Sequence, residues 1–135
     1  MSGVAQLADA LRAEGGLLAA SLRSGDAAGA PADEPLLATV ADGSYALTLA
    51  AVREGYLLHY ADGNVVDTPD ADLALLGGDR LYALALAELA WLGDLDAVAA
   101  LAELISDCAR AHAEGDEMGA ASAWNAAVQA IGRTR

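Results

Sequence analysis

The chain has 135 residues, a hydrophobic fraction of 56% and a net charge of -13 at pH 7, since 20 acidic residues stand against 7 basic ones, all arginine. A surface this negative repels phosphate groups, so the composition argues against binding to nucleic acid or to an anionic membrane surface. The length suits a single core, and much of the apolar excess is alanine, which favours helices. We therefore expect one all-α domain spanning residues 1–135.

Cysteine usage and charge placement predict a cytoplasmic protein without membrane insertion. Cys108 is the only cysteine and cannot form an internal disulfide. The N-terminal stretch carries Asp9 and Arg12 where a signal peptide would need an apolar core. Arg80 and Glu88 interrupt the most apolar run, so we expect no membrane span.

The N-terminal helix has its leucines on one face, but glycines interrupt it. Gly15 and Gly16 each weaken a helix by about 1 kcal/mol relative to alanine, so two short helices fit as well as one long helix. The following residues, 24–35, are small, polar and punctuated by glycine and proline. This composition predicts a flexible linker or loop and the only candidate boundary in the domain.

A second helical pattern starts near Ser44, which can act as its N-cap. Tyr45, Tyr56, His59 and Tyr60 share one stripe of that helix together with aliphatic residues. A functional interpretation is a pocket wall lined by three tyrosines and a histidine. The simpler interpretation is an ordinary core face whose phenol groups reach its rim.

The segment 61–72 is the most polar loop and offers four carboxylates, those of Asp62, Asp67, Asp70 and Asp72. It fails as an EF-hand calcium loop, because the position that needs a bidentate glutamate is Leu73. A magnesium site is a weak alternative, since no arginine within the loop could help to hold a substrate phosphate. We favour a solvated loop in which Asp70 or Asp72 caps the next helix, with no metal or cofactor.

The run 73–92 is apolar nearly all round, which predicts the central helix of a bundle of about five helices or one half of a subunit interface. Adjacent glycines at 77–78 would destabilise it unless a neighbouring backbone approaches closely or the helix bends. Because covering helices from one chain can hide only one side, we expect a homo-oligomer or a hetero-oligomer. The expected interface residues are Leu75, Tyr82, Leu86 and Leu89.

A break at Gly93 and Asp94 separates the central run from an amphipathic helix, and a last helix follows Gly115. Cys108 and His112 stand one turn apart on the apolar stripe of the first of these helices. A cysteine and a histidine at this spacing suit a nucleophile and its base or two metal ligands, but two residues complete neither site. A buried thiol near a hydrogen-bonded core histidine is the favoured interpretation.

Several parts of this pattern occur in order along one known family of enzymes. A leucine-rich turn and two glycines precede Asp79, a Gly-Asp break follows at 93–94, and the next helix ends in Ala-Glu-Gly-Asp at 113–116. Upstream stand His59 and the run 65–67, Val-Val-Asp. This arrangement resembles trans-isoprenyl diphosphate synthases over sixty to seventy residues, and the resemblance implies prenyl-synthase-like helix packing.

The catalytic motifs of that family are missing. The synthases hold Mg²⁺ ions between two Asp-Asp-x-x-Asp motifs, which neutralise the leaving pyrophosphate, and this chain has neither motif. The resemblance therefore implies a short non-catalytic accessory or regulatory subunit, such as that of two-component hexaprenyl or heptaprenyl diphosphate synthases, which pairs with a catalytic subunit and influences product chain length. The alternatives are a self-associating helical scaffold or adaptor unrelated to isoprenoids, and a metal-dependent enzyme that uses the loop carboxylates.

Overall fold

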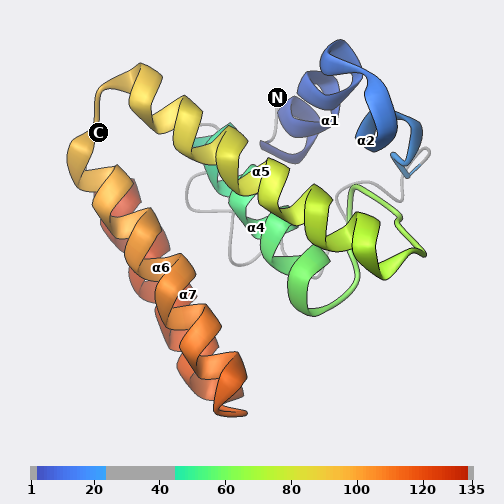
Figure 1. The fold of residues 1–135 in the computed structure, drawn as a ribbon. Coiled ribbons are helices and arrows are strands. Elements are labelled where there is room, and N and C mark those ends of the chain that lie inside the picture. The colour runs from blue at the N-terminus through green and yellow to red at the C-terminus, as the bar shows by residue number, and fades with distance from the viewer. Residues whose placement is uncertain (1–2, 24–44, 134–135) are drawn as a thin grey trace.

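The computed structural model describes residues 3–23 and 45–133. Their helices are α1 (Gly3–Glu14), α2 (Gly16–Ala20), α4 (Ala46–Tyr60), α5 (Ala71–Leu92), α6 (Leu95–Ala113) and α7 (Glu117–Arg133) (Figure 1). No strand occurs in these ranges, only one isolated bridge between Leu22 and Val66, so the predicted all-α class is confirmed. The predicted linker at 24–35 and the predicted cap Ser44 lie outside the described residues.

The N-terminal pattern forms two helices, and the break falls at the predicted glycines. Gly15 and Gly16 have φ angles of 76° and 82°, a left-handed conformation that side chains other than glycine rarely adopt. α1 buries Leu7 and Leu11, and the short α2 buries Leu18. The two helices therefore cover the core as separate pieces.

The central helix of the bundle is α4 and not α5, which corrects the prediction for the run 73–92. Ten of the 15 residues of α4 are buried, among them Leu49, Val52 and Glu54, whereas α5 buries only five of its 22. In Figure 1 α4 lies behind α5, and its main packing neighbours are α5 and α1. Many residues of α5 are alanines or leucines that remain at the surface, so its apolar composition does not reflect burial.

The two glycines in α5 permit the close approach of α4 that their sequence position suggested. A Cβ on Gly78 would overlap the ring of His59 and lie 3.0 Å from the carbonyl oxygen of Gly55. A Cβ on Gly55 would in turn lie 2.9 Å from the carbonyl oxygen of Gly78. The helices thus cross backbone to backbone at this pair, as small residues at an interface allow.

Helices α6 and α7 form an antiparallel hairpin, here called the arm, which leads away from the end of α5 (Figure 1). Gly93 ends α5 with a φ of 75°, and the Asp94 side chain caps α6 by accepting a hydrogen bond from the Ala97 amide at 3.0 Å. The predicted break at these two residues is confirmed. The buried faces of the arm meet through Leu101, Leu104 and Cys108 on α6 and Ala120, Trp124, Val128 and Ile131 on α7.

A buried carboxylate fixes the loop between α4 and α5. Glu54 is 2% exposed, and its oxygens accept hydrogen bonds from the amides of Asn64 at 3.0 Å and of Val65 and Val66 at 2.9 Å. Arg23 donates to the Gly63 carbonyl at 2.9 Å on the other side of the loop. The segment that the sequence presents as polar and solvated is therefore anchored from within the core.

No helix in the described ranges is long and apolar enough to cross a membrane.

Candidate functional site

An aromatic–histidine cluster, made by Tyr56, Tyr60, His112 and Trp124, joins α4 to the arm. The Tyr56 hydroxyl and His112 Nε2 are hydrogen-bonded at 2.7 Å. The Tyr60 ring stacks on the His112 ring with centroids 4.0 Å apart and an interplanar angle of 5°. Tyr56 also meets the edge of Trp124 at a centroid distance of 5.3 Å. The cluster thus holds α4 and the arm together through ring contacts.

The other histidine, His59, lies next to the cluster on α4 and packs against α5. His59 Nε2 is 3.1 Å from the Asp79 carboxylate, although the geometry is not that of a hydrogen bond. Its ring lies 5.1 Å from that of Tyr82 and 5.9 Å from that of Tyr60. Three members of the predicted pocket wall, Tyr56, His59 and Tyr60, therefore share the C-terminal end of α4, where Tyr56 and His59 are half-buried and Tyr60 is exposed.

Tyr45 does not belong to this group. It precedes α4 at its N-terminal end, and its hydroxyl donates to the Asp94 carboxylate at the start of α6. Tyr45 therefore ties α4 to the arm at a second point, whereas Tyr56 does so near the other end. The pocket-wall interpretation stays a prediction for the three remaining residues.

Burial raises the pKa of the phenol and thiol groups around the cluster. Desolvation raises the pKa of Tyr82 and the pKa of Tyr56 above the usual phenol value. Burial likewise raises the pKa of the Cys108 thiol from 9.0 to about 11. A thiol with a raised pKa is a poor nucleophile. With Cys108 buried and His112 bonded to Tyr56, the favoured interpretation of this cysteine and histidine is confirmed.

The four loop carboxylates do not gather at one site. Asp70 caps α5 by accepting the Asp72 amide at 2.8 Å and the Leu73 amide at 3.4 Å, so one of the two predicted caps is confirmed. Asp67 lies 3.7 Å from the Arg23 guanidinium, and Asp62 is exposed. Within residues 3–23 and 45–133, no three carboxylate, cysteine or histidine side chains come close enough to hold a metal ion.

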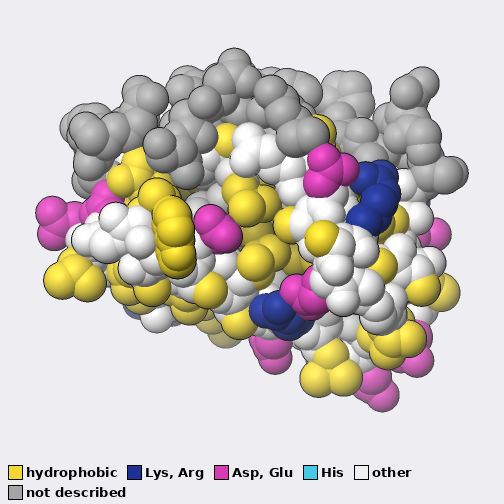
Figure 2. All heavy atoms as spheres, turned by 90° about the horizontal axis from the view of Figure 1, so that it is seen from above, with side chains coloured by type: hydrophobic (Ala, Val, Ile, Leu, Met, Phe, Trp, Pro, Cys, Tyr) yellow, Lys and Arg dark blue, Asp and Glu magenta, His cyan; other side chains and the backbone are white. Residues whose placement is uncertain are grey.

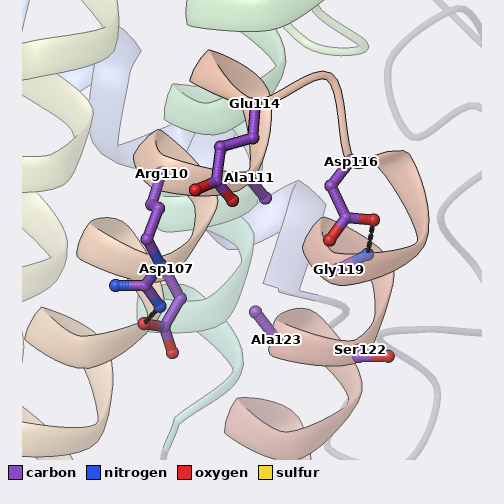
Figure 3. A pocket seen from close by; sticks show the side chains of 8 residues that line it. All are labelled: Asp107, Arg110, Ala111, Glu114, Asp116, Gly119, Ser122 and Ala123. Atoms are coloured by element: carbon purple, nitrogen blue, oxygen red, sulfur yellow. Dashed lines mark hydrogen bonds and ion pairs between the residues drawn. The ribbon is translucent and has the colours of Figure 1, made fainter.

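A pocket of about 280 Å³ lies between the two helices of the arm near their connecting turn (Figure 3). An ion pair of 2.7 Å joins Arg110 to Asp107 on one wall, and on the other Asp116 caps α7 by accepting the Gly119 amide at 2.9 Å. Figure 3 shows Ala111 and Ala123 between the helices, with the Glu114 carboxylate above them. Two of the three carboxylates that line the pocket, those of Asp107 and Asp116, therefore already interact with other residues of the arm.

The most unusual surface of the molecule lies where α5 meets α6. Here Trp91, Leu92 and Leu95, together called the corner patch, are 85%, 39% and 79% exposed. In Figure 2 hydrophobic side chains gather at the left, over this end of α5, with acidic side chains beside them. Near the other end of α5, Leu75 and Leu76 are 50% and 67% exposed. An exposed tryptophan beside two leucines is typical of an interaction site.

The predicted interface residues share one side of α5 but differ in burial. Leu75 is at the surface, and Tyr82 and Leu86 are half-buried. Leu89 is fully buried against the core, because it continues the row of Leu81 and Ala85 at four-residue spacing. Leu89 is therefore corrected to a core residue and is not available to a partner.

The sequence reasoning missed two of the most informative side chains. Glu54 is the only carboxylate of α4 and follows a largely apolar run, which is the signal that it serves a specific partner. Trp91 belongs to the apolar run 73–92, yet it stands on the outside. Its position at the end of a helix, two residues before Gly93, is the feature that could have suggested exposure.

Comparison of the chain with protein families, with curated proteins and with solved structures finds no match.

Proposed function

We propose that this protein is a non-catalytic subunit that binds a second protein through the outer face of α5 and the corner patch. The observation that carries the proposal is the exposure of Trp91 and Leu95 beside a half-exposed Leu92. Fully burying a large apolar side chain contributes about 1.5–3 kcal/mol, so covering this patch would supply a substantial binding free energy. Tryptophan is also among the residues that most often dominate interface energetics.

The described residues give little support to a catalytic role. Cys108 is buried with a raised thiol pKa, and His112 is bonded to Tyr56. The metal-dependent alternative would need the loop carboxylates to converge, yet Asp70 serves as a helix cap and Asp67 lies beside Arg23. A binding role therefore agrees best with the side chains that the structure describes.

The partner class that we propose is a catalytic polyprenyl diphosphate synthase subunit, whose product chain length this protein would influence. The support is the sequence pattern around Asp79, the Gly-Asp break at 93–94 and the run 113–116, together with the lack of Asp-Asp-x-x-Asp motifs. The competing proposal is a scaffold that associates with itself through the same face and has no role in isoprenoid synthesis.

The test combines the chain with a catalytic prenyl synthase encoded beside its gene. Sedimentation velocity should show a complex, and the products formed from an allylic diphosphate, isopentenyl diphosphate and Mg²⁺ should change in length when the chain is added. The chain alone should form no product. The double variant Trp91→Asp, Leu95→Asp should not enter the complex, since buried carboxylates without partners are costly.

A matched control is Leu17→Asp, because Leu17 is 69% exposed on α2, a helix outside the proposed surface. This variant should bind as the wild type does. Elongated product from the chain alone would refute a non-catalytic role. A dimer of the chain alone that the double variant dissociates, with no binding to the synthase, would favour the scaffold.

A further inference from the structure

We infer that the corner patch binds a basic amphipathic helix supplied by the partner. This inference rests on the proposed binding function and specifies the chemistry of the partner. The patch offers an indole and two leucine side chains at the point where α5 ends and α6 begins. A helix with apolar residues at spacings of three and four can place one apolar face on such a group of side chains.

Along the chain, the charges on both sides of the patch have one sign. No lysine or arginine occurs in residues 81–109. This range contains the patch, the part of α5 before it and the part of α6 after it. It includes five carboxylates, those of Glu88, Asp94, Asp96, Glu103 and Asp107. Glu88 precedes Trp91 by one helical turn and therefore lies beside the patch. Asp96 is exposed in the first turn of α6, next to Leu95 in the sequence.

The five arginines whose side chains the structure describes are engaged away from the patch, and a sixth, Arg133, ends α7. Arg12 pairs with Asp9 and Arg80 with Glu14, while Arg110 pairs with Asp107 toward the far end of α6. The remaining two are Arg53, whose guanidinium lies 4.9 Å from the centroid of the Trp124 ring, and Arg23, which holds the loop at Gly63. Among the described side chains, none therefore neutralises Glu88 or Asp96 from within the chain.

This distribution of charge favours one kind of binding partner for the corner patch over others. Two copies of a chain with a net charge of -13 repel each other, and anionic lipid is repelled for the same reason. A helix with an apolar face flanked by lysine or arginine gains from both the apolar patch and the carboxylates around it. Electrostatic complementarity of this kind raises the association rate and excludes acidic competitors.

The test uses two synthetic 18-residue amphipathic peptides with the same leucine pattern, one with lysine and one with glutamate on the polar face. The wild-type chain is titrated with each, and tryptophan emission is followed. The lysine peptide should shift the emission of Trp91 to shorter wavelength as the ring leaves water. Trp124 is 2% exposed and should contribute a constant background, which Trp91→Phe measures directly.

Two variants separate the patch from general attraction to an acidic protein. Trp91→Asp, Leu95→Asp makes the chain more negative, so binding by charge alone should stay equal or strengthen, whereas binding at the patch should weaken at least about tenfold. The double variant Glu88→Gln, Asp96→Asn keeps the apolar side chains and the fold. It should lower the affinity for the lysine peptide by about tenfold at low salt. Raising the salt concentration should weaken wild-type binding in the same direction.

The inference is wrong if both peptides bind equally, if the emission of Trp91 does not move, or if the double aspartate variant binds as well as the wild type. It is also wrong if sedimentation shows a dimer of the chain alone and the double aspartate variant dissociates that dimer. A synthase complex that forms equally well with Glu88→Gln, Asp96→Asn would leave the proposed function standing and refute only the basic helix. Loss of the synthase complex with retention of peptide binding would refute the proposed function alone.

Discussion

The imidazole ring of His59 occupies the space that a side chain at Gly78 would need. A Cβ built on Gly78 would overlap both Cδ2 and Nε2 of that ring, and it would also lie 3.0 Å from the Gly55 carbonyl oxygen. His59 is held in turn between Tyr82 and the Asp79 carboxylate. The crossing of α4 and α5 therefore depends on the absence of a single methyl group.

Gly78→Ala should destabilise the protein by up to about 2 kcal/mol. Overpacking a close contact typically costs 1–3 kcal/mol, which outweighs the gain of about 1 kcal/mol in helix propensity. Gly77→Ala is the matched control, because its Cβ would meet only the flexible end of Leu18 at 3.0 Å and Leu58 at 3.4 Å. Urea denaturation of both variants measures the difference, and equal stabilities would contradict the backbone contact.

Glu54→Gln should cost about 1–3 kcal/mol of unfolding free energy, although it removes no side-chain volume. The carboxylate accepts three loop amides, and an amide group in its place would turn an N–H toward at least one of those donors. Hydrogen exchange of the Val65 and Val66 amides should accelerate. Glu103→Gln, an exposed change on α6, should stay within about 0.5 kcal/mol of the wild type.

Tyr56→Phe should destabilise the protein by about 1 kcal/mol, because it removes the hydroxyl bonded to His112 and keeps the ring contacts. Tyr60→Phe is the paired control. Its ring would still stack on His112, and the Tyr60 side chain is 39% exposed, so the loss should be smaller. Thermal unfolding followed by circular dichroism compares the two, and a larger loss for Tyr60→Phe would contradict the role of the hydroxyl.

Cys108 should make the protein less stable at alkaline pH. Its thiol pKa is raised from 9.0 to about 11 in the folded state, so the folded protein holds the proton more tightly than the unfolded chain. The stabilisation that comes from this tighter proton binding by Cys108 is fully present below pH 9 and is lost as the pH rises toward 11. Cys108→Ala should flatten this part of the stability curve. At pH 8 the thiol should react with a disulfide reagent only at the rate of unfolding.

The helices could be predicted from the sequence because their breaks are local. Gly15, Gly93 and Asp70 each mark a terminus by backbone conformation or by a side-chain cap, and neighbouring residues alone determine these features. The role of the glycine pair in α5 was stated correctly as a close approach. The helix that approaches could not be named, since that depends on how distant segments pack.

The choice of central helix could not be made from composition. α4 carries Arg53, Glu54 and His59, which suggest a surface helix. Arg53 nevertheless lies over a tryptophan ring, Glu54 accepts three loop amides, and the His59 ring packs on Gly78 of α5. α5 has no charged group in its second half except Glu88, and it still leaves Trp91 outside. Contacts between distant segments, which only tertiary structure supplies, therefore decided which helix was buried.

The aromatic–histidine cluster has a mechanical consequence. In the described part of the chain, Tyr56 and Tyr60 meet the arm through rings and one hydroxyl, and the backbone hydrogen bonds at the corner stay within the turn at Gly93. Such side-chain contacts can be peeled apart one after another, whereas the α4–α5 crossing has interlocked backbones. Under a pulling force applied between α1 and α7, we expect the arm to detach first as an intact hairpin and the α4–α5 pair to yield last.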